Sequence, residues 1–97
     1  ERALSLDPAL AGAHHNLALA LVGSGRPSEA LPHYQETLRL MPDSAAAHHN
    51  LALALGQLGK YGEAMAHEER AVALQPDFPE ARDHLEWLRR NWAKARN

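Results

Sequence analysis

The nine residues Ala-His-His-Asn-Leu-Ala-Leu-Ala-Leu occur twice in the chain, at positions 13–21 and again at positions 47–55. The two copies are 34 residues apart, and the same interval separates Pro8 from Pro42 and Pro42 from Pro76. When residues 11–44 are aligned with residues 45–78 without gaps, 17 of the 34 positions are identical. A period of this length predicts a stack of helical repeats.

The amino-acid composition also favours helices. Ala and Leu account for 35 of the 97 residues, Ile is absent, and the β-branched residues are only Val22, Thr37 and Val72. Strands are rich in β-branched and aromatic residues, so an all-α fold is predicted. The absence of Cys excludes a disulfide framework, a thiolate metal site and a cysteine nucleophile.

Each repeat predicts two helices joined by a short turn. In the first repeat, residues 17–21 form an apolar face at helical spacing, and the Gly-Ser-Gly sequence at 23–25 ends the helix. Pro27 suits the first turn of the second helix, and Pro42 ends it. The second repeat follows the same plan.

The resulting domain organisation is a single domain in four parts. These are the end of a preceding repeat at 1–10, repeats at 11–44 and 45–78, and a C-terminal capping helix at 79–97. The last helix carries Glu86 and Arg89 where both repeats have apolar residues, so we expect this helix to face solvent. At the other end, the apolar residues of the N-terminal half-helix are expected to lack a partner helix and to favour self-association. They are Ala3, Leu4 and Leu6.

These residues resemble the tetratricopeptide repeat family, whose 34-residue units are helix–turn–helix pairs. The matching residues in the first repeat are Asn16-Leu17-Ala18, Leu21, Gly25, Glu29-Ala30, Tyr34, Leu38 and Pro42. Those in the second repeat are Asn50-Leu51-Ala52, Leu55, Gly59, Tyr61, Glu63-Ala64, Ala71 and Pro76. The resemblance implies a right-handed α-solenoid of antiparallel helix pairs. The sequence departs from the family where His14 and His48 replace an aromatic residue, and where Glu68 replaces the aromatic residue that Tyr34 represents.

In this family the first helices line a concave groove that often binds extended peptides. Carried over position by position, the resemblance implies a groove of His15, Asn16, Leu19, His49, Asn50, Leu53, Gln57, His84, Trp87 and Arg90, with Val22, Gly56, Asp83 and Asn91 on the same face. Because an amide both donates and accepts, Asn16 and Asn50 suit a peptide backbone. We expect both amides to be free and His15 and His49 to be exposed. The alternative is that the two Asn side chains bond to neighbouring helices.

Some family members instead clamp an acidic C-terminal carboxylate. That clamp requires Lys, Asn, Asn, Lys and Arg, whereas the corresponding residues here are His15, Leu19, Asn50, Glu80 and His84. Only Asn50 matches, and Glu80 has the wrong charge, so the clamp is not expected.

Metal binding and catalysis are not predicted. Adjacent histidines such as His14-His15 point about 100° apart around a helix. Stacked helices are roughly 10 Å apart, so His15 and His49 cannot share one ion without a third group. We therefore expect no native metal and no cofactor. The run Glu68-Glu69-Arg70 is interpreted as a solvated face, and no nucleophile motif or phosphate loop is present.

The predicted function is a non-catalytic protein-interaction scaffold that binds an extended peptide or a partner helix. The first alternative is the substrate-recognition arm of a larger enzyme, because the array, including Asp77-Phe78-Pro79-Glu80-Ala81, is similar to those of O-linked N-acetylglucosamine transferase-like proteins. The second alternative is a self-assembly module.

The expected partner is a protein or peptide. A net charge of −2 argues against nucleic acid, and no apolar run approaches the roughly 20 residues that span a bilayer. The Arg89-Arg90 pair with its neighbouring tryptophans could stack bases, but cations that complement a helix C-terminus explain it better. No secretory leader is visible, so a cytoplasmic location is expected.

Overall fold

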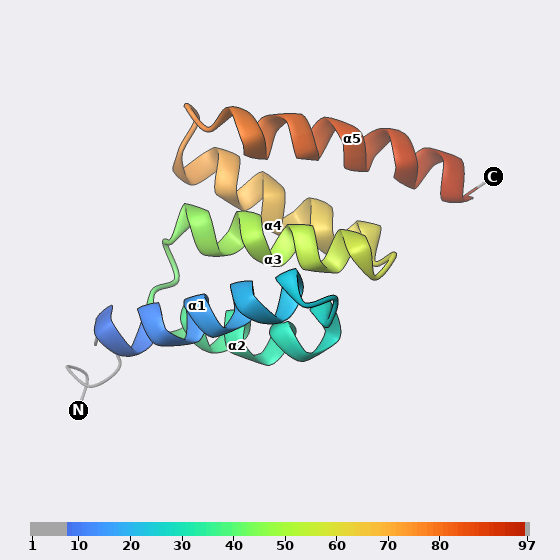
Figure 1. Ribbon diagram of the computed structural model, residues 1–97. Helices are drawn as coiled ribbons and strands as arrows, with labels where there is room; N and C mark the ends of the chain where they lie inside the picture. The colour runs from blue at the N-terminus through green and yellow to red at the C-terminus, as the bar shows by residue number, and fades with distance from the viewer. Residues whose placement is uncertain (1–7, 97) are drawn as a thin grey trace.

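The computed structural model describes residues 8–96, which form five α-helices and no strand (Figure 1). The helices are α1 (Pro8–Gly23), α2 (Pro27–Leu40), α3 (Ala45–Gln57), α4 (Tyr61–Leu74) and α5 (Pro79–Arg96). The predicted all-α repeat fold is confirmed. The expectations about Ala3, Leu4 and Leu6 lie outside the described residues. Within residues 8–96, no helix is both long and apolar enough to cross a membrane.

The turns inside the two repeats have the same hydrogen-bonding pattern. The N–H of Arg26 donates to the carbonyl of Leu21 at 2.8 Å, and the N–H of Lys60 donates to that of Leu55 at 2.9 Å. This is the bonding of a Schellman motif, which needs a left-handed residue just before the donor. Gly25 and Gly59 occupy that position with φ of 77° and 78°. A side chain at either position would be strained, which explains why the turn glycine repeats.

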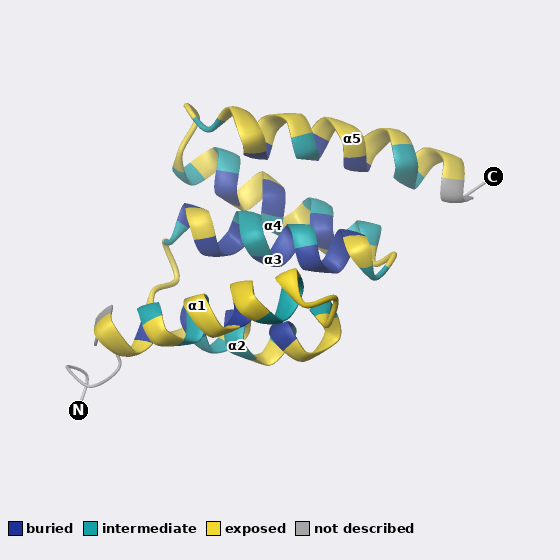
Figure 2. Cartoon of the chain, in the orientation of Figure 1, coloured by how far each residue is buried: buried dark blue, intermediate teal, exposed yellow. Residues whose placement is uncertain are grey.

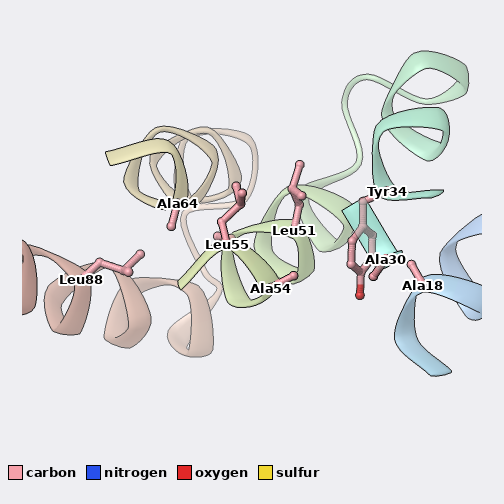
Figure 3. Close-up of a cluster of buried hydrophobic side chains, with 9 residues drawn as sticks. Ala18, Ala30, Tyr34, Leu51, Ala54, Leu55, Ala64 and Leu88 are labelled. Carbon is pink, nitrogen blue, oxygen red and sulfur yellow. The ribbon is translucent and has the colours of Figure 1, made fainter. Parts of the chain in front are cut away.

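The helices pack as antiparallel pairs that follow one another. Helix α1 packs on α2 and α3 on α4, while α2 and α4 each pack on the first helix of the next unit. Small residues allow this close approach, since Ala18, Ala30, Ala52 and Ala64 are fully buried. The larger buried side chains around them include Tyr34, Leu51, Leu55 and Leu88 (Figure 3).

Equivalent apolar positions are buried to different degrees along the stack (Figure 2). Leu17 is 47% exposed, whereas Leu51 and Leu85, one and two repeats later, are 2% and 6% exposed. The reason is that α3 and α5 each follow a packed second helix, while the described residues include no helix on that side of α1. The predicted apolar face of residues 17–21 is therefore only partly buried, chiefly through Ala18.

Helix α5 presents the charged residues that the sequence singled out. Glu86 and Arg89 are exposed, and Arg89 lies 3.6 Å from Glu69 on α4. No charge at these positions is buried, although the role of α5 as a cap stays a prediction.

Candidate functional site

The predicted groove residues lie on the first helices of the repeats. Helix α1 carries His15, Asn16 and Leu19, helix α3 carries His49, Asn50, Leu53 and Gln57, and helix α5 carries His84, Trp87 and Arg90. The exposed members are Asn16, Leu19, Gln57, Trp87 and Arg90, and the other five are half-buried. This face therefore combines exposed polar and apolar groups with three half-buried imidazoles, one half-buried amide and one half-buried leucine.

A pocket lies between α3 and α5 on this face, lined by Leu53, Gly56, Gln57, His84 and Trp87. The Trp87 ring stacks on His84 with centroids 5.8 Å apart, and it meets Tyr61 edge-on at 6.0 Å. These two contacts hold the indole in place while 41% of the residue stays exposed. The sequence placed all five lining residues on one face, and the structure brings them together.

Between the first and second repeats the buried contacts join uncharged side chains, and the charged pair of Arg70 with Asp43 lies at the exposed edge. The Asn50 amide donates to Nε2 of His15 at 2.8 Å, and the His15 ring meets Tyr34 edge-on with centroids 5.7 Å apart. Burial lowers the pKa of His15 and raises the pKa of Tyr34 to about 12. The expectation of a free Asn50 amide is therefore wrong, because the amide bonds to the neighbouring helix. Asn16 is exposed.

The interface between the second repeat and α5 carries charge. The Nδ1 atom of His49 lies 2.9 and 3.0 Å from the two carboxylate oxygens of Glu68, and Nδ1 of His84 lies 2.5 Å from one of them. The Glu68 side chain is fully buried, and those of His49 and His84 are 12% and 16% exposed. Each imidazole N–H can thus donate to the carboxylate.

Two sequence expectations fail at this interface. Glu68 does not belong to a solvated face, although Glu69 and Arg70 do, because Glu68 occupies the register of Tyr34, which points into the core. His49 is not substantially exposed, because it packs against Glu68 and the Phe78 ring, whose centroid is 4.9 Å away. The signal was present in the sequence, since the repeat alignment places Glu68 opposite Tyr34.

The remaining histidines form stacked pairs that sequence reasoning missed. Nδ1 of His14 lies 3.2 Å from Nδ1 of His33, and the equivalent atoms of His48 and His67 lie 3.1 Å apart. In each pair one ring must donate and the other accept. In each pair the two histidines are 19 residues apart in sequence, so one lies on the first helix and the other on the second helix of the same repeat. Burial, and to a lesser degree the neighbouring His48, lowers the pKa of His67.

Three potential metal ligands also converge in the structure. One ligand atom each from His49, Glu68 and His84 lies within 4.8 Å of the other two. The expectation of no metal site weighed adjacent histidines, and it weighed His15 with His49 on neighbouring first helices in the absence of a third group. It did not consider a carboxylate that reaches the same point from the second helix.

Comparison with known proteins identifies the class. The tetratricopeptide repeat family model matches residues 15–79, which is most of the chain. The chain therefore belongs to the tetratricopeptide repeat family. No curated protein matches it.

Solved structures support the same fold. The TPR2AB domain of yeast Sti1, in a complex with pHSP90, superposes with a TM-score of 0.89 at 20% identity. That match covers 96% of this chain and 36% of the other. The first TPR of Spaghetti (RPAP3), bound to the HSP90 peptide SRMEEVD, gives 0.83 at 24% identity, with 91% and 68% covered. At these identities the likeness shows the fold alone.

Proposed function

We propose that the chain is a non-catalytic scaffold that binds an extended peptide across the first helices α1, α3 and α5. The observation that carries this proposal is the pocket between α3 and α5, where Trp87 is both exposed and held by two ring contacts. An exposed, rigid aromatic side chain beside an apolar pocket is typical of the residues that dominate peptide and protein binding. A protein or peptide is thus favoured over nucleic acid or a membrane.

The chemistry of the pocket indicates the class of peptide. An apolar side chain of the peptide would contact Leu53, Trp87 and the aliphatic part of Gln57. The peptide backbone would form hydrogen bonds with the exposed amides of Asn16 and Gln57. The two neighbouring structures contain HSP90 or an HSP90 peptide. This chain lacks four of the five clamp residues implied by the family resemblance, and Asn50 is already bonded to His15. We therefore propose a peptide anchored by an apolar side chain rather than by its C-terminal carboxylate.

Selection from a random linear peptide library, followed by binding measurements, tests this function. Trp87→Ala should weaken the selected peptides at least about tenfold, as expected for loss of a central aromatic anchor. Met41→Ala is the matched control, because Met41 is 42% exposed and apolar but lies in the α2–α3 loop. Amide chemical shifts should change on α3 and α5. Equal affinities for the wild type and Trp87→Ala, or shifts confined to α2 and α4, would contradict the proposal.

An enzyme arm is the alternative function. Its support is the similarity of residues 77–81 and of the repeated Asn16 and Asn50 to arrays of O-linked N-acetylglucosamine transferase-like proteins. The structure weakens this support, because Asn50 is engaged and His84 occupies the equivalent position on α5. Sequencing the parent gene beyond residue 97 tests it, since a glycosyltransferase domain in the same reading frame would be required.

Self-association is a further proposal. Leu10 and Leu17 on α1 are 43% and 47% exposed, and Leu17 is equivalent to Leu51, which is buried where a preceding second helix packs. Leu17→Gln should reduce the mass measured by light scattering at high concentration. A wild-type chain that stays monomeric throughout would contradict this proposal.

A further inference from the structure

The interface between the second repeat and α5 places three metal-binding side chains around one point. They come from three different helices: His49 from α3, Glu68 from α4 and His84 from α5. Both imidazoles turn Nδ1 toward the same carboxylate, at 2.5 to 3.0 Å. We propose that these residues form a binding site for a divalent transition-metal ion such as Zn²⁺, with two Nδ1 atoms, the carboxylate and a water molecule as ligands.

The distances suit a tetrahedral ion. Zn²⁺ binds imidazole nitrogen at about 2.0–2.1 Å and carboxylate oxygen at about 2.0–2.2 Å, which places neighbouring ligand atoms about 3.3 Å apart. The hydrogen-bonded pairs are slightly closer than this, and all three ligand atoms lie within 4.8 Å of one another. Side-chain movements of about an ångström would therefore bring them to one ion.

The charge of the cluster favours a cation. Glu68 is fully buried, and within residues 8–96 its ion-pair partners are only the two histidines. When both imidazoles are neutral, the cluster holds one uncompensated negative charge. Such a charge is costly in a low-dielectric interior, and a divalent ion would compensate it and leave the cluster with a net charge of +1.

The proton balance can also be met. In the hydrogen-bonded state each imidazole carries its proton on Nδ1, whereas a metal at Nδ1 requires the proton on Nε2. His84 lines the pocket between α3 and α5, and its Nε2 lies on the Gly56 side of that pocket. Water in the pocket can therefore accept a hydrogen bond from the Nε2–H of His84 when the ion occupies Nδ1.

Neighbouring rings fix the orientation of both imidazoles. His84 stacks on Trp87, and His49 packs against Phe78. Such surrounding contacts orient metal-binding histidines and raise the affinity of a site.

The previous interface provides an internal control. One repeat earlier, the same three positions hold His15, Tyr34 and Asn50, which also contact one another but lack the ligand set. The double variant Glu68→Tyr/His84→Asn therefore removes two ligands and introduces residues that this fold already accommodates. Circular dichroism should show that it is folded.

Calorimetric titration of the metal-free 97-residue chain with Zn²⁺ alone tests the site. We expect one tight equivalent in the wild type, with affinity reduced more than about a hundredfold in Glu68→Gln and in the double variant. His14→Gln, which disrupts a stacked histidine pair, should keep the tight equivalent and lose only weak background binding. If the double variant does not fold, the isosteric Glu68→Gln variant decides the outcome.

Nitrogen NMR of the histidine rings gives a second readout. Zn²⁺ should move the Nδ1 resonances of His49 and His84 to metal-bound positions and place the proton on Nε2. Wild-type binding weaker than about 0.1 mM would overturn the proposal. So would tight binding that Glu68→Gln leaves unchanged, or ring shifts confined to the stacked pairs. Because this experiment contains no peptide, its outcome is independent of the proposed function.

Discussion

Glu68 shows how one residue changes the chemistry of a repeat. Tyr34 and Glu68 occupy the same register, and both are buried against the imidazole that lies 19 residues earlier. Tyr34 contacts His15 through ring packing, whereas Glu68 accepts hydrogen bonds from His49 and His84. Because the two positions are equivalent in the repeat, the change from Tyr to Glu introduces the charge that His49 and His84 then meet.

Loss of the Glu68 carboxylate should destabilise the fold. Glu68→Ala leaves two largely buried N–H donors without their acceptor, which costs about 1–3 kcal/mol per group. Urea unfolding in the presence of a chelator measures this loss. Glu69→Ala is the control, because Glu69 is exposed and forms only a 3.6 Å surface pair with Arg89, worth about 0–1 kcal/mol. Equal losses in the two variants would contradict the buried role of Glu68.

His15 should make stability depend on pH. Burial lowers its pKa below 6.5, and protonated Nε2 could no longer accept the hydrogen bond from Asn50. The unfolded chain therefore binds the proton first, and the free energy of unfolding should fall as pH drops below about 6.5. Stability above that pH is unaffected by this group. In His15→Gln the decrease between pH 7 and pH 5 should be smaller, as measured by urea unfolding, and an identical pH slope would refute the prediction.

At the scale of single residues, the sequence predicted the residues of the pocket but not the ion pairs of Glu68 with His49 and His84. Leu53, Gln57, His84 and Trp87 were assigned to one face, and they line one pocket. Glu68 was assigned to solvent because adjacent charges usually are exposed, although its register with a buried tyrosine indicated the opposite. Hydrogen bonds between helices, such as that of Asn50 to His15, depend on distances that periodicity does not supply.

At the scale of the helix, the repeat predicted the fold because local and packing signals agree. The turn glycines Gly25 and Gly59 have the positive φ that the turn requires, and the repeated alanines are buried where helices meet. The sequence could not predict that Leu17 is exposed and Leu51 buried. Their local sequences are identical, and only the neighbouring helix differs.

Equivalent positions in different helices should respond differently to charge. Ala52 is fully buried, so Ala52→Glu should cost about 3 kcal/mol or more because it buries an unpaired carboxylate. Glu86 is exposed at the equivalent position of α5, so Glu86→Ala should be neutral or slightly stabilising. Denaturant unfolding of both variants measures the difference. Equal losses would refute the view that α5 turns this face to solvent.

At the scale of the whole molecule, stability should vary along the stack. Each helix packs mainly on its neighbours in sequence, so opening of one end need not unfold the rest. Helix α3 is covered by both α2 and α4, while Leu10 and Leu17 leave one side of α1 exposed. Amide hydrogen exchange should therefore be faster in α1 than in α3, as measured by NMR. Uniform protection across both helices would indicate a single cooperative unit instead.

The 34-residue translation between the two interfaces has an evolutionary consequence. Two amino-acid substitutions, at the positions of Tyr34 and Asn50, separate a junction with uncharged buried contacts from one with the composition of His49, Glu68 and His84. Because every junction is built on the same backbone, new chemistry can arise at one of them while its neighbours keep their original role. Duplicated units thus supply spare copies of an already folded scaffold, on which selection can act one junction at a time.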